Sequence, residues 1–184
     1  MCRFSSAAIR TMILSATGEG FRQGNEHVLQ ELGRNVGIIW GNRTTLQVGG
    51  ERAGRRIFLS VDDARAIAAE SSMVAVVSPE LERGAVAVKS LYNAANVRVT
   101  GVEPQYQGIR TIEVAGGRNL TWSDETQRLR GALLGHDIAE QLFGTRQVIG
   151  ETIAINGLPY AVVGRIRNKE QDSNYNGPDN NKIF

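Results

Sequence analysis

The first amphipathic run of the chain lies between Ile13 and Leu32. Its apolar residues recur at the spacing of one helix face, and they are Ile13, Leu14, Phe21, Val28, Leu29 and Leu32. Gly33 follows directly and is a typical residue to end a helix. The pattern predicts one continuous helix from residue 13 to about residue 32.

Three glycines inside this run, Gly18, Gly20 and Gly24, raise the alternative of a phosphate-binding loop between a strand and a helix. The dinucleotide motif needs the spacing GxGxxG, and here the third glycine comes one position late. A Walker-type loop needs Lys and then Ser or Thr after its last glycine, whereas Gly24 is followed by Asn25 and Glu26. The stretch "NVGIIWGNR" also lacks a carboxylate that could bind a ribose. The helix is the better interpretation, and we expect no nucleotide there.

The next patterns predict a helix between two strands. The short apolar run "NVGIIW" (35–40) is typical of a strand, and so is "MVAVVSP" (73–79), which we expect to be buried and to end at its proline. Between them, Ser60 precedes Asp63 by three residues, which is a capping box with Asp in the usual place of Glu. The apolar residues that then share one helix face are Ala64, Ile67 and Ala68.

The second half of the chain is rich in strand patterns and has one clear helix. Residues 84–102 alternate in "AVAVKS" and "ANVRVTGV", as half-buried strands do. The stretches "GIRTIEVAGGR" (108–118) and "RLRGALLG" (128–135) indicate further strands. The stretch "HDIAEQLFG" (136–144) predicts a helix that Gly144 closes.

The last patterns predict a hairpin, a polar loop and a strand. In "ETIAINGLPYAVVGRIR" (151–167), the two arms meet at Asn156 and Gly157, the favoured dipeptide of a two-residue turn. A long polar stretch follows, and "KIF" indicates that a strand begins at Lys182.

Composition limits the possible partners. The 184 residues are 41% hydrophobic and 22% charged, which is typical of a folded protein. Their net charge of +2 is too small for a nucleic-acid binder, and no aromatic residues interleave with the arginine clusters. The single cysteine, Cys2, excludes an intrachain disulfide. Because of the low net charge and the missing aromatic residues, we expect no nucleic-acid partner. No run approaches the roughly 20 apolar residues of a membrane-spanning helix.

Candidate catalytic and metal-binding residues do not form a constellation. Each histidine has a glutamate four residues later, so a helix would place each pair on one face and two pairs could hold zinc. The pairs are His27 with Glu31 and His136 with Glu140. They are far apart in sequence, however, and such residues on amphipathic helices are usually solvated. A GxSxG nucleophile motif is absent, and Asp62 with Asp63 fits a helix N-terminus better than a catalytic pair. We expect no catalytic residues, cofactor or metal, and no enzymatic activity.

The motifs taken in order resemble a known family. They are "GEGF", "FLSVDDARAIA", "VSPEL", "VTGVEPQYQGIRTIEVAGGRNLTWSDE", "ALLGHDIAEQLFG", "VIGETIAINGLPYAVVGRIRNK" and "DNNKIF". In sequence and spacing they resemble the extracytoplasmic (periplasmic) core domain of MacB-like, FtsX-family ABC transporter permeases. The resemblance covers nearly all of residues 13 to 184.

This resemblance implies an α+β fold of two subdomains. Residues 1–35 would hold the N-terminal segment and the end of a first membrane helix. Residues 36–80 and 168–184 would form a split porter-like α/β subdomain, in which the Ser60 helix lies between the two predicted strands and the strand from Lys182 completes the unit. Residues 81–167 would form an inserted, mostly-β subdomain. We expect the chain to be excised from a longer membrane protein.

The resemblance also implies a function. The domain would lie on the periplasmic side of the cell inner membrane and transmit ATP-driven conformational change to export or to an extracytoplasmic partner. Its partners would be an ABC ATPase subunit or domain, a second permease in a homodimer or heterodimer, and a periplasmic adaptor. The alternative is a ligand- or protein-binding module without a transport role. We expect partner contact in the polar loop, at Asp172, Ser173, Asn174 and Tyr175.

Overall fold

The structure is a computed structural model that describes residues 36–45, 53–169 and 176–184. The predicted helix of residues 13 to 32 lies outside these ranges. The loop residues Asp172, Ser173, Asn174 and Tyr175 lie outside them as well.

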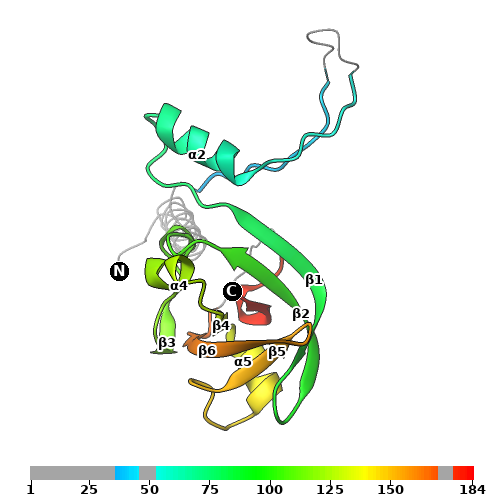
Figure 1. Ribbon diagram of the computed structural model, residues 1–184, viewed down its shortest axis with the longest axis vertical. Helices are drawn as coiled ribbons and strands as arrows, with labels where there is room; N and C mark the ends of the chain where they lie inside the picture. Colours follow the sequence, from blue (N-terminus) through cyan, green and yellow to red (C-terminus); the bar gives the residue numbers. More distant parts are fainter. Residues whose placement is uncertain (1–35, 46–52, 170–175) are drawn as a thin grey trace, which may run out of the picture.

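The described part of the chain combines short helices with seven strands, which confirms the predicted α+β class. In chain order the elements are α2 (Val61–Glu70), β1 (Glu80–Lys89), β2 (Ala94–Val102), α3 (Tyr106–Ile109), β3 (Val114–Gly117), α4 (Trp122–Thr126), β4 (Gly131–Leu134), α5 (His136–Phe143), β5 (Thr152–Ile155), β6 (Leu158–Ile166), the 3-10 turn η1 (Asp179–Asn181) and β7 (Lys182–Ile183). Figure 1 traces them from α2 and its flanking segments, residues 36–45 and 53–79, which we call the arm, to the sheet.

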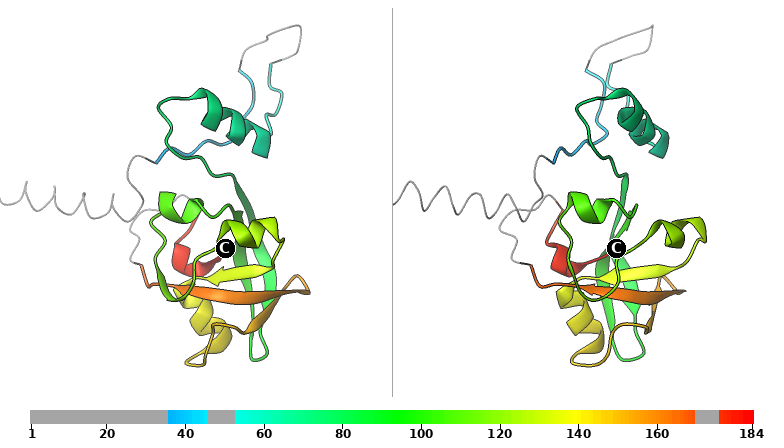
Figure 2. Two further views of the ribbon diagram at one scale, coloured as in Figure 1. Left: turned by 60° about the vertical axis from the view of Figure 1, so that its left-hand side comes forward. Right: turned by 90° about the vertical axis from the view of Figure 1, so that its left-hand side faces the viewer.

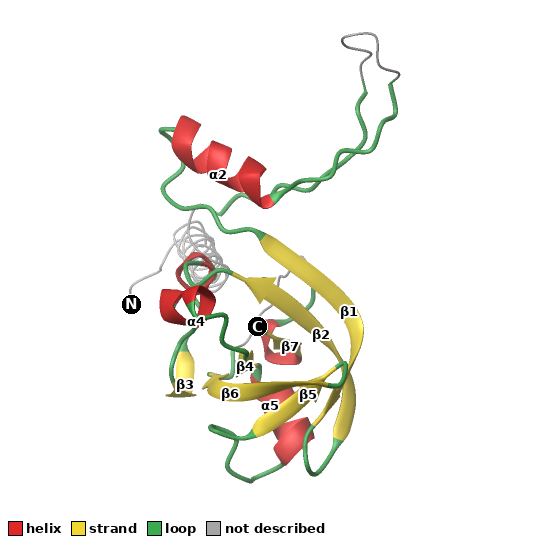
Figure 3. Cartoon of the chain, in the orientation of Figure 1, coloured by secondary structure: helices red, strands yellow, loops and turns green. Residues whose placement is uncertain are grey.

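The seven strands form one sheet that closes on itself. The strand order is β3-β6-β4-β7-β2-β1-β5, and β5 also pairs with β6, so six of the strands make a ring. The β4–β6 and β2–β7 pairs are parallel, and the other pairs are antiparallel. Figure 3 shows the strands curving around α5 and the C-terminal segment. A closed sheet of this kind leaves few strand edges exposed to solvent.

Local signals in the sequence fix several of these elements. Asn156 and Gly157 have φ angles of 49° and 82°, as a tight turn with two left-handed residues requires, and they join β5 to β6 in the predicted hairpin. Gly144 ends α5 with φ of 64°. The side-chain oxygen of Ser90, in the β1–β2 turn, donates to the backbone carbonyl of Leu142 at 2.7 Å. That hydrogen bond ties the turn to the end of α5.

The main core lies between α5 and the inner face of the strands. Helix α5 buries Ile138, Ala139, Leu142 and Phe143 against alternate residues of the sheet, and the other buried members of this cluster are Val86, Val88, Val97, Ala132, Leu134, Val148, Ile153, Ile155, Val162 and Ile183. A second cluster, made of Tyr106, Ile112, Leu133, Ile166 and Phe184, joins α3 to the opposite face. The apolar C-terminal residues thus contribute to both cores.

Strand β7 is inserted between β2 and β4. Ile183 pairs with Val99 of β2 and with Leu134 of β4, and the backbone of Phe184 exchanges two hydrogen bonds with Leu133. The predicted strand at Lys182 is therefore confirmed, but its expected position was wrong. It completes the sheet of residues 80–166 rather than a unit around the Ser60 helix. The wider division into a split and an inserted subdomain stays a prediction.

The predicted helix after Ser60 is confirmed. The backbone N–H of Ser60 donates to Asp63 at 2.7 Å, and the backbone N–H of Asp63 donates to the Ser60 hydroxyl at 3.3 Å, which completes the capping box. The backbone N–H and the hydroxyl of Ser60 both donate to the Asp63 carboxylate, and these two hydrogen bonds lower the pKa of Asp63. No residue of α2 is buried, however. Figure 2 shows α2 and its flanking segments standing clear of the sheet in both views.

The two strands predicted beside this helix were wrong. Residues 36–40 and 73–79 have no strand structure, and most of their side chains are exposed. Residues with a high strand propensity form a strand only where a neighbouring strand supplies hydrogen bonds and a packing surface. Within the described residues, neither segment has such a neighbour. Near them, the described residues form one isolated bridge, between Arg43 and Arg56.

A short ion-paired turn holds α4 against the chain before it. The carboxylate of Asp124 accepts hydrogen bonds from both terminal nitrogens of Arg118, at 2.6 and 2.7 Å. The backbone N–H and the hydroxyl of Thr121 also donate to it, each at 2.8 Å. The Arg118 guanidinium and these Thr121 donors hold the pKa of Asp124 well below its usual range.

Replacing Gly135 with alanine should destabilise the domain. Gly135 links β4 to α5, and an added Cβ would overlap the carbonyl oxygen of Asn180 in the packed C-terminal segment. Overpacking against backbone costs about 3 kcal/mol. Urea unfolding followed by circular dichroism measures the loss. Gly108→Ala is the matched control, because nothing lies within 4 Å of its added Cβ. Equal stability of the two variants would contradict the packing.

Asp124 should make the stability of the domain depend on pH. Its pKa is lower in the folded chain than in the unfolded chain, so its contribution is full above the unfolded value of about 4 and is lost as the pH falls. The free energy of unfolding, measured between pH 7 and pH 3, should therefore fall less steeply toward acid in Asp124→Asn than in the wild type. Parallel pH curves would disprove this role.

Candidate ligand pocket and buried ion cluster

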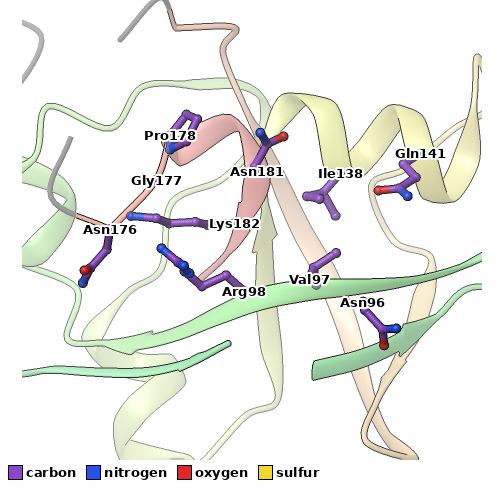
Figure 4. Close-up of a pocket in the computed structure, with 10 residues that line it drawn as sticks. All are labelled: Asn96, Val97, Arg98, Ile138, Gln141, Asn176, Gly177, Pro178, Asn181 and Lys182. Atoms are coloured by element: carbon purple, nitrogen blue, oxygen red, sulfur yellow. The ribbon is translucent and has the colours of Figure 1, made fainter. Parts of the chain in front are cut away.

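An open pocket lies where the C-terminal segment passes between β2 and α5. Its volume is about 360 Å³. Strand β2 contributes one wall and α5 another, and the segment around η1 closes the third side. The lining residues are Asn96, Val97, Arg98, Ile138, Gln141, Asn176, Gly177, Pro178, Asn181 and Lys182. In Figure 4, Arg98 and Lys182 run toward Asn176, on the side away from Ile138 and Gln141.

The pocket has two charged lining residues, Arg98 and Lys182. The Nε of Arg98 lies 2.8 Å from a carboxylate oxygen of Glu82 on the neighbouring strand, which fixes the side chain across β2. Gly177 has φ of +81°, and an added Cβ there would lie 3.3 Å from an Arg98 nitrogen. Glycine therefore lets the chain turn closely past the guanidinium. The other polar lining groups are mainly side-chain amides.

Beneath the pocket lies a buried ion cluster of Arg110, Asp179 and Lys182. Their side chains are 3%, 0% and 1% exposed. Arg110 donates to both carboxylate oxygens of Asp179, at 3.3 and 3.4 Å, and the Lys182 ammonium lies 3.4 Å from one of them. Buried charges persist in proteins when they are paired in this way. The cluster holds η1 against α3.

Asn180 extends these polar contacts to the chain after β6. Its side-chain amide donates to the side-chain oxygen of Asn168 at 2.8 Å and to the backbone carbonyl of Lys169 at 3.0 Å, and its own oxygen accepts from the Lys169 N–H at 3.1 Å. The Lys169 ammonium donates to the backbone carbonyl of Arg110 at 3.1 Å. The two ends of the polar loop are thereby held together.

The sequence analysis did not select this site. The predicted contact residues, Asp172, Ser173, Asn174 and Tyr175, fall in the undescribed loop that precedes Asn176. Arg110, Asp179 and Lys182 were missed as a cluster, because Arg110 and Asp179 are 69 residues apart and their motifs do not indicate that the two side chains meet. The one available signal was the pair of charged residues, Asp179 and Lys182, on either side of the two asparagines. That pattern did not indicate that their side chains are buried.

The histidine and carboxylate pairs lie elsewhere. His136 Nε2 is 3.6 Å from Glu140 on the surface of α5, and Nδ1 is 3.2 Å from Asp137. His27 is outside the described ranges. Asp62 pairs with Arg65 on α2, while Asp63 caps that helix. Across residues 36–45, 53–169 and 176–184, no three His, Cys, Asp or Glu side chains gather as metal ligands.

Arg98 and several side-chain amides give the pocket a polar lining, and the buried cluster beneath it holds the C-terminal strand. The fold and the site define an α+β domain built on a closed mixed sheet. A family model described as the MacB-like periplasmic core domain matches residues 10–184, and the chain belongs to this family. The resemblance read from the motifs is confirmed.

Relatives and solved structures agree with this assignment. The macrolide export ATP-binding/permease protein MacB of Bdellovibrio bacteriovorus is 33% identical over 156 residues, which are 84% of this chain and 24% of that protein. The periplasmic region of MacB from Actinobacillus actinomycetemcomitans matches with a TM-score of 0.61 at 18% identity, over 84% of this chain and 66% of that structure. The extracellular domain of the noncanonic ABC-type transporter YknZ from Gram-positive bacteria matches with a TM-score of 0.56 at 19% identity, over 60% and 58% of the two chains.

The chain spans about a quarter of the length of the curated relatives it matches. None of the helices that the structure describes is long and apolar enough to cross a membrane.

Asp179→Asn should destabilise the domain strongly. The change removes the carboxylate from between two buried cations, and breaking a buried ion pair costs about 3–5 kcal/mol. Asp62→Asn is the matched control, because it breaks an exposed ion pair with Arg65 and such pairs contribute little. Guanidinium denaturation compares the two variants. A similar, small loss in both would show that the cluster does not hold η1.

Proposed function

We propose that this domain is the periplasmic part of an ABC transporter permease and that it transmits ATP-driven conformational change to export or to an extracytoplasmic partner. It is not itself an enzyme. The full-length protein lies in the inner membrane and works with an ABC ATPase subunit or domain, as a homodimer or heterodimer, with a periplasmic adaptor as a further partner. Two relatives, both macrolide export ATP-binding/permease proteins, support this proposal.

The position of β7 is the observation that carries the proposal. This strand is hydrogen-bonded on both sides, to β2 and to β4, within a sheet that closes on itself. The turn before it is held by the buried pairs of Asp179. A displacement of the C-terminal strand along its axis therefore loads several hydrogen bonds and ion pairs together. The sheet would move as one body rather than deform around the strand.

The family resemblance implies that the chain after Phe184 leads toward a second membrane helix. Movement of that helix would then reach the sheet through β7. The β1–β2 turn, where Leu91 is 83% exposed, lies at the other end of β1 from the arm around α2. In this proposal it is the part of the domain that presents the movement to an export partner.

A ligand-binding module remains the second candidate function. The pocket beside Arg98 favours it, since a cavity of about 360 Å³ with a fixed guanidinium and several amides is large enough for a small polar molecule. This candidate needs no ATP-dependent movement of the sheet. The two functions therefore differ in whether ATP moves the sheet.

Spin-label distances in the full-length permease with its ATPase test this difference. A single label at Leu91→Cys in each copy of the dimer should report a distance between copies that changes between the ATP-bound and ATP-free states. A label pair within one sheet, Leu91→Cys with Leu158→Cys, should report an unchanged distance, because both positions are exposed and β1, which precedes Leu91, and β6, which begins at Leu158, both pair with β5.

If the distance between copies is the same in the ATP-bound and ATP-free states, this result would contradict the transmission of movement and favour the ligand-binding module. A change within the sheet of the same size as the change between copies would contradict rigid transmission.

A further inference from the structure

The pocket beside Arg98 has a positively charged lining without a carboxylate. Arg98 and Lys182 line it, and of the described residues around it none is Asp or Glu. The carboxylates that pair with these two cations, Glu82 and Asp179, lie outside the lining. An anion that enters the pocket is therefore attracted by the cations and meets no carboxylate in the lining.

The guanidinium of Arg98 is oriented before any ligand binds. Its Nε forms the ion pair with Glu82, and the Arg98 side chain is still 39% exposed. Within the part of the chain that the structure describes, its two terminal nitrogens make no hydrogen bond. A planar pair of guanidinium nitrogens matches the two oxygens of a carboxylate, and the opposite charges strengthen both hydrogen bonds. An incoming carboxylate thus meets a donor pair that is already in place.

Side-chain amides surround this guanidinium. The four amides that line the pocket belong to Asn96, Gln141, Asn176 and Asn181. Among the described residues, none of these four side chains is hydrogen-bonded to another protein group. An amide side chain offers both donors and an acceptor. The pocket can therefore bind the donors and acceptors of an uncharged polar group next to the anion.

The two ends of the pocket differ in chemistry. In Figure 4, Arg98 and Lys182 run toward Asn176 at one end, while Ile138 and Gln141 lie at the other end. The volume of about 360 Å³ is near the lower limit for pockets that bind small molecules. This shape suits a small ligand with an anionic group at one end and an uncharged polar group at the other.

From these observations we infer that the pocket binds a small organic carboxylate that also carries an amide, such as an N-acylated amino acid. The carboxylate pairs with the terminal nitrogens of Arg98, and the amide of the ligand is hydrogen-bonded by the lining amides. This inference rests on the second candidate function, because it names the ligand class of that site. It involves no ATP-driven movement of the sheet.

Protection of a cysteine in the full-length protein tests this inference. In a background without native cysteines, Asn181→Cys places a thiol in the pocket lining at an exposed position. N-acetylglycine should slow its reaction with N-ethylmaleimide at least threefold, because a bound ligand covers the thiol. Leu158→Cys is the matched control, since it is exposed but lies outside the pocket, and its labelling rate should not change.

Two other probes, used at the same ionic strength, establish the ligand class. N-acetylglycinamide, which lacks only the carboxylate, should not protect Asn181→Cys. Inorganic phosphate should protect it less than N-acetylglycine does, because phosphate has no group for the lining amides. Equal labelling with and without N-acetylglycine would overturn the inference. So would equal protection by any two of the three probes, or protection at Leu158→Cys.

Variants of Arg98 test the role of its paired nitrogens. Arg98→Gln should abolish the protection by N-acetylglycine. Arg98→Lys should weaken it at least threefold although the charge is kept, because an ammonium lacks the planar pair of nitrogens, and this variant also serves if Arg98→Gln folds poorly. Unchanged protection in either variant would overturn the inference. The labelling is done without ATP, so its failure leaves the spin-label distances, and with them the transmission of movement, unaffected.

Discussion

The closed sheet depends on one short strand. Without β7, the backbones of β2 and β4 would face each other across a gap and each would present an unpaired edge. Lys182 and Ile183 fill that gap with only two residues of strand, helped by the backbone pair between Phe184 and Leu133. The side chains of Ile183 and Phe184 then enter the two separate cores. The ring of strands and both cores therefore depend on the same three residues.

Polar contacts hold this strand in register. A two-residue strand makes too few hydrogen bonds to define its own position, but the turn before it is buried together with its charges. Asp179 is held between Arg110 and Lys182, and Asn180 binds the chain after β6 through three hydrogen bonds. Gly135 permits this approach, because its missing side chain makes room for the carbonyl of Asn180. A shift by one residue would turn Ile183 and Phe184 each toward the other core and would break the ion pairs of Asp179.

The sequence predicts those elements whose determinants are close together in the chain. The capping box at Ser60, the Asn156–Gly157 turn and the amphipathic α5 each depend on a few neighbouring residues, and all three are confirmed. The partners of β7 could not be predicted, since strand pairing joins residues about 50 to 85 positions apart. The ion cluster could not be predicted for the same reason, because the burial of Asp179 depends on Arg110, which is distant in the sequence, and not on the residues next to Asp179 in the chain.

The two wrong strands have a different cause. Residues 35–40 and 73–79 carry the β-branched and aromatic side chains that sheets favour, but propensity supplies no hydrogen-bond partner. Within the described residues, neither segment pairs with a strand of the sheet. The same physical rule applies to both parts of the molecule: β7 is a strand because it has a partner on each side, whereas residues 36–40 and 73–79 have no strand partner among the described residues. A lever built from these parts would take its stiffness from the sheet, in which each strand of the ring is paired on both sides.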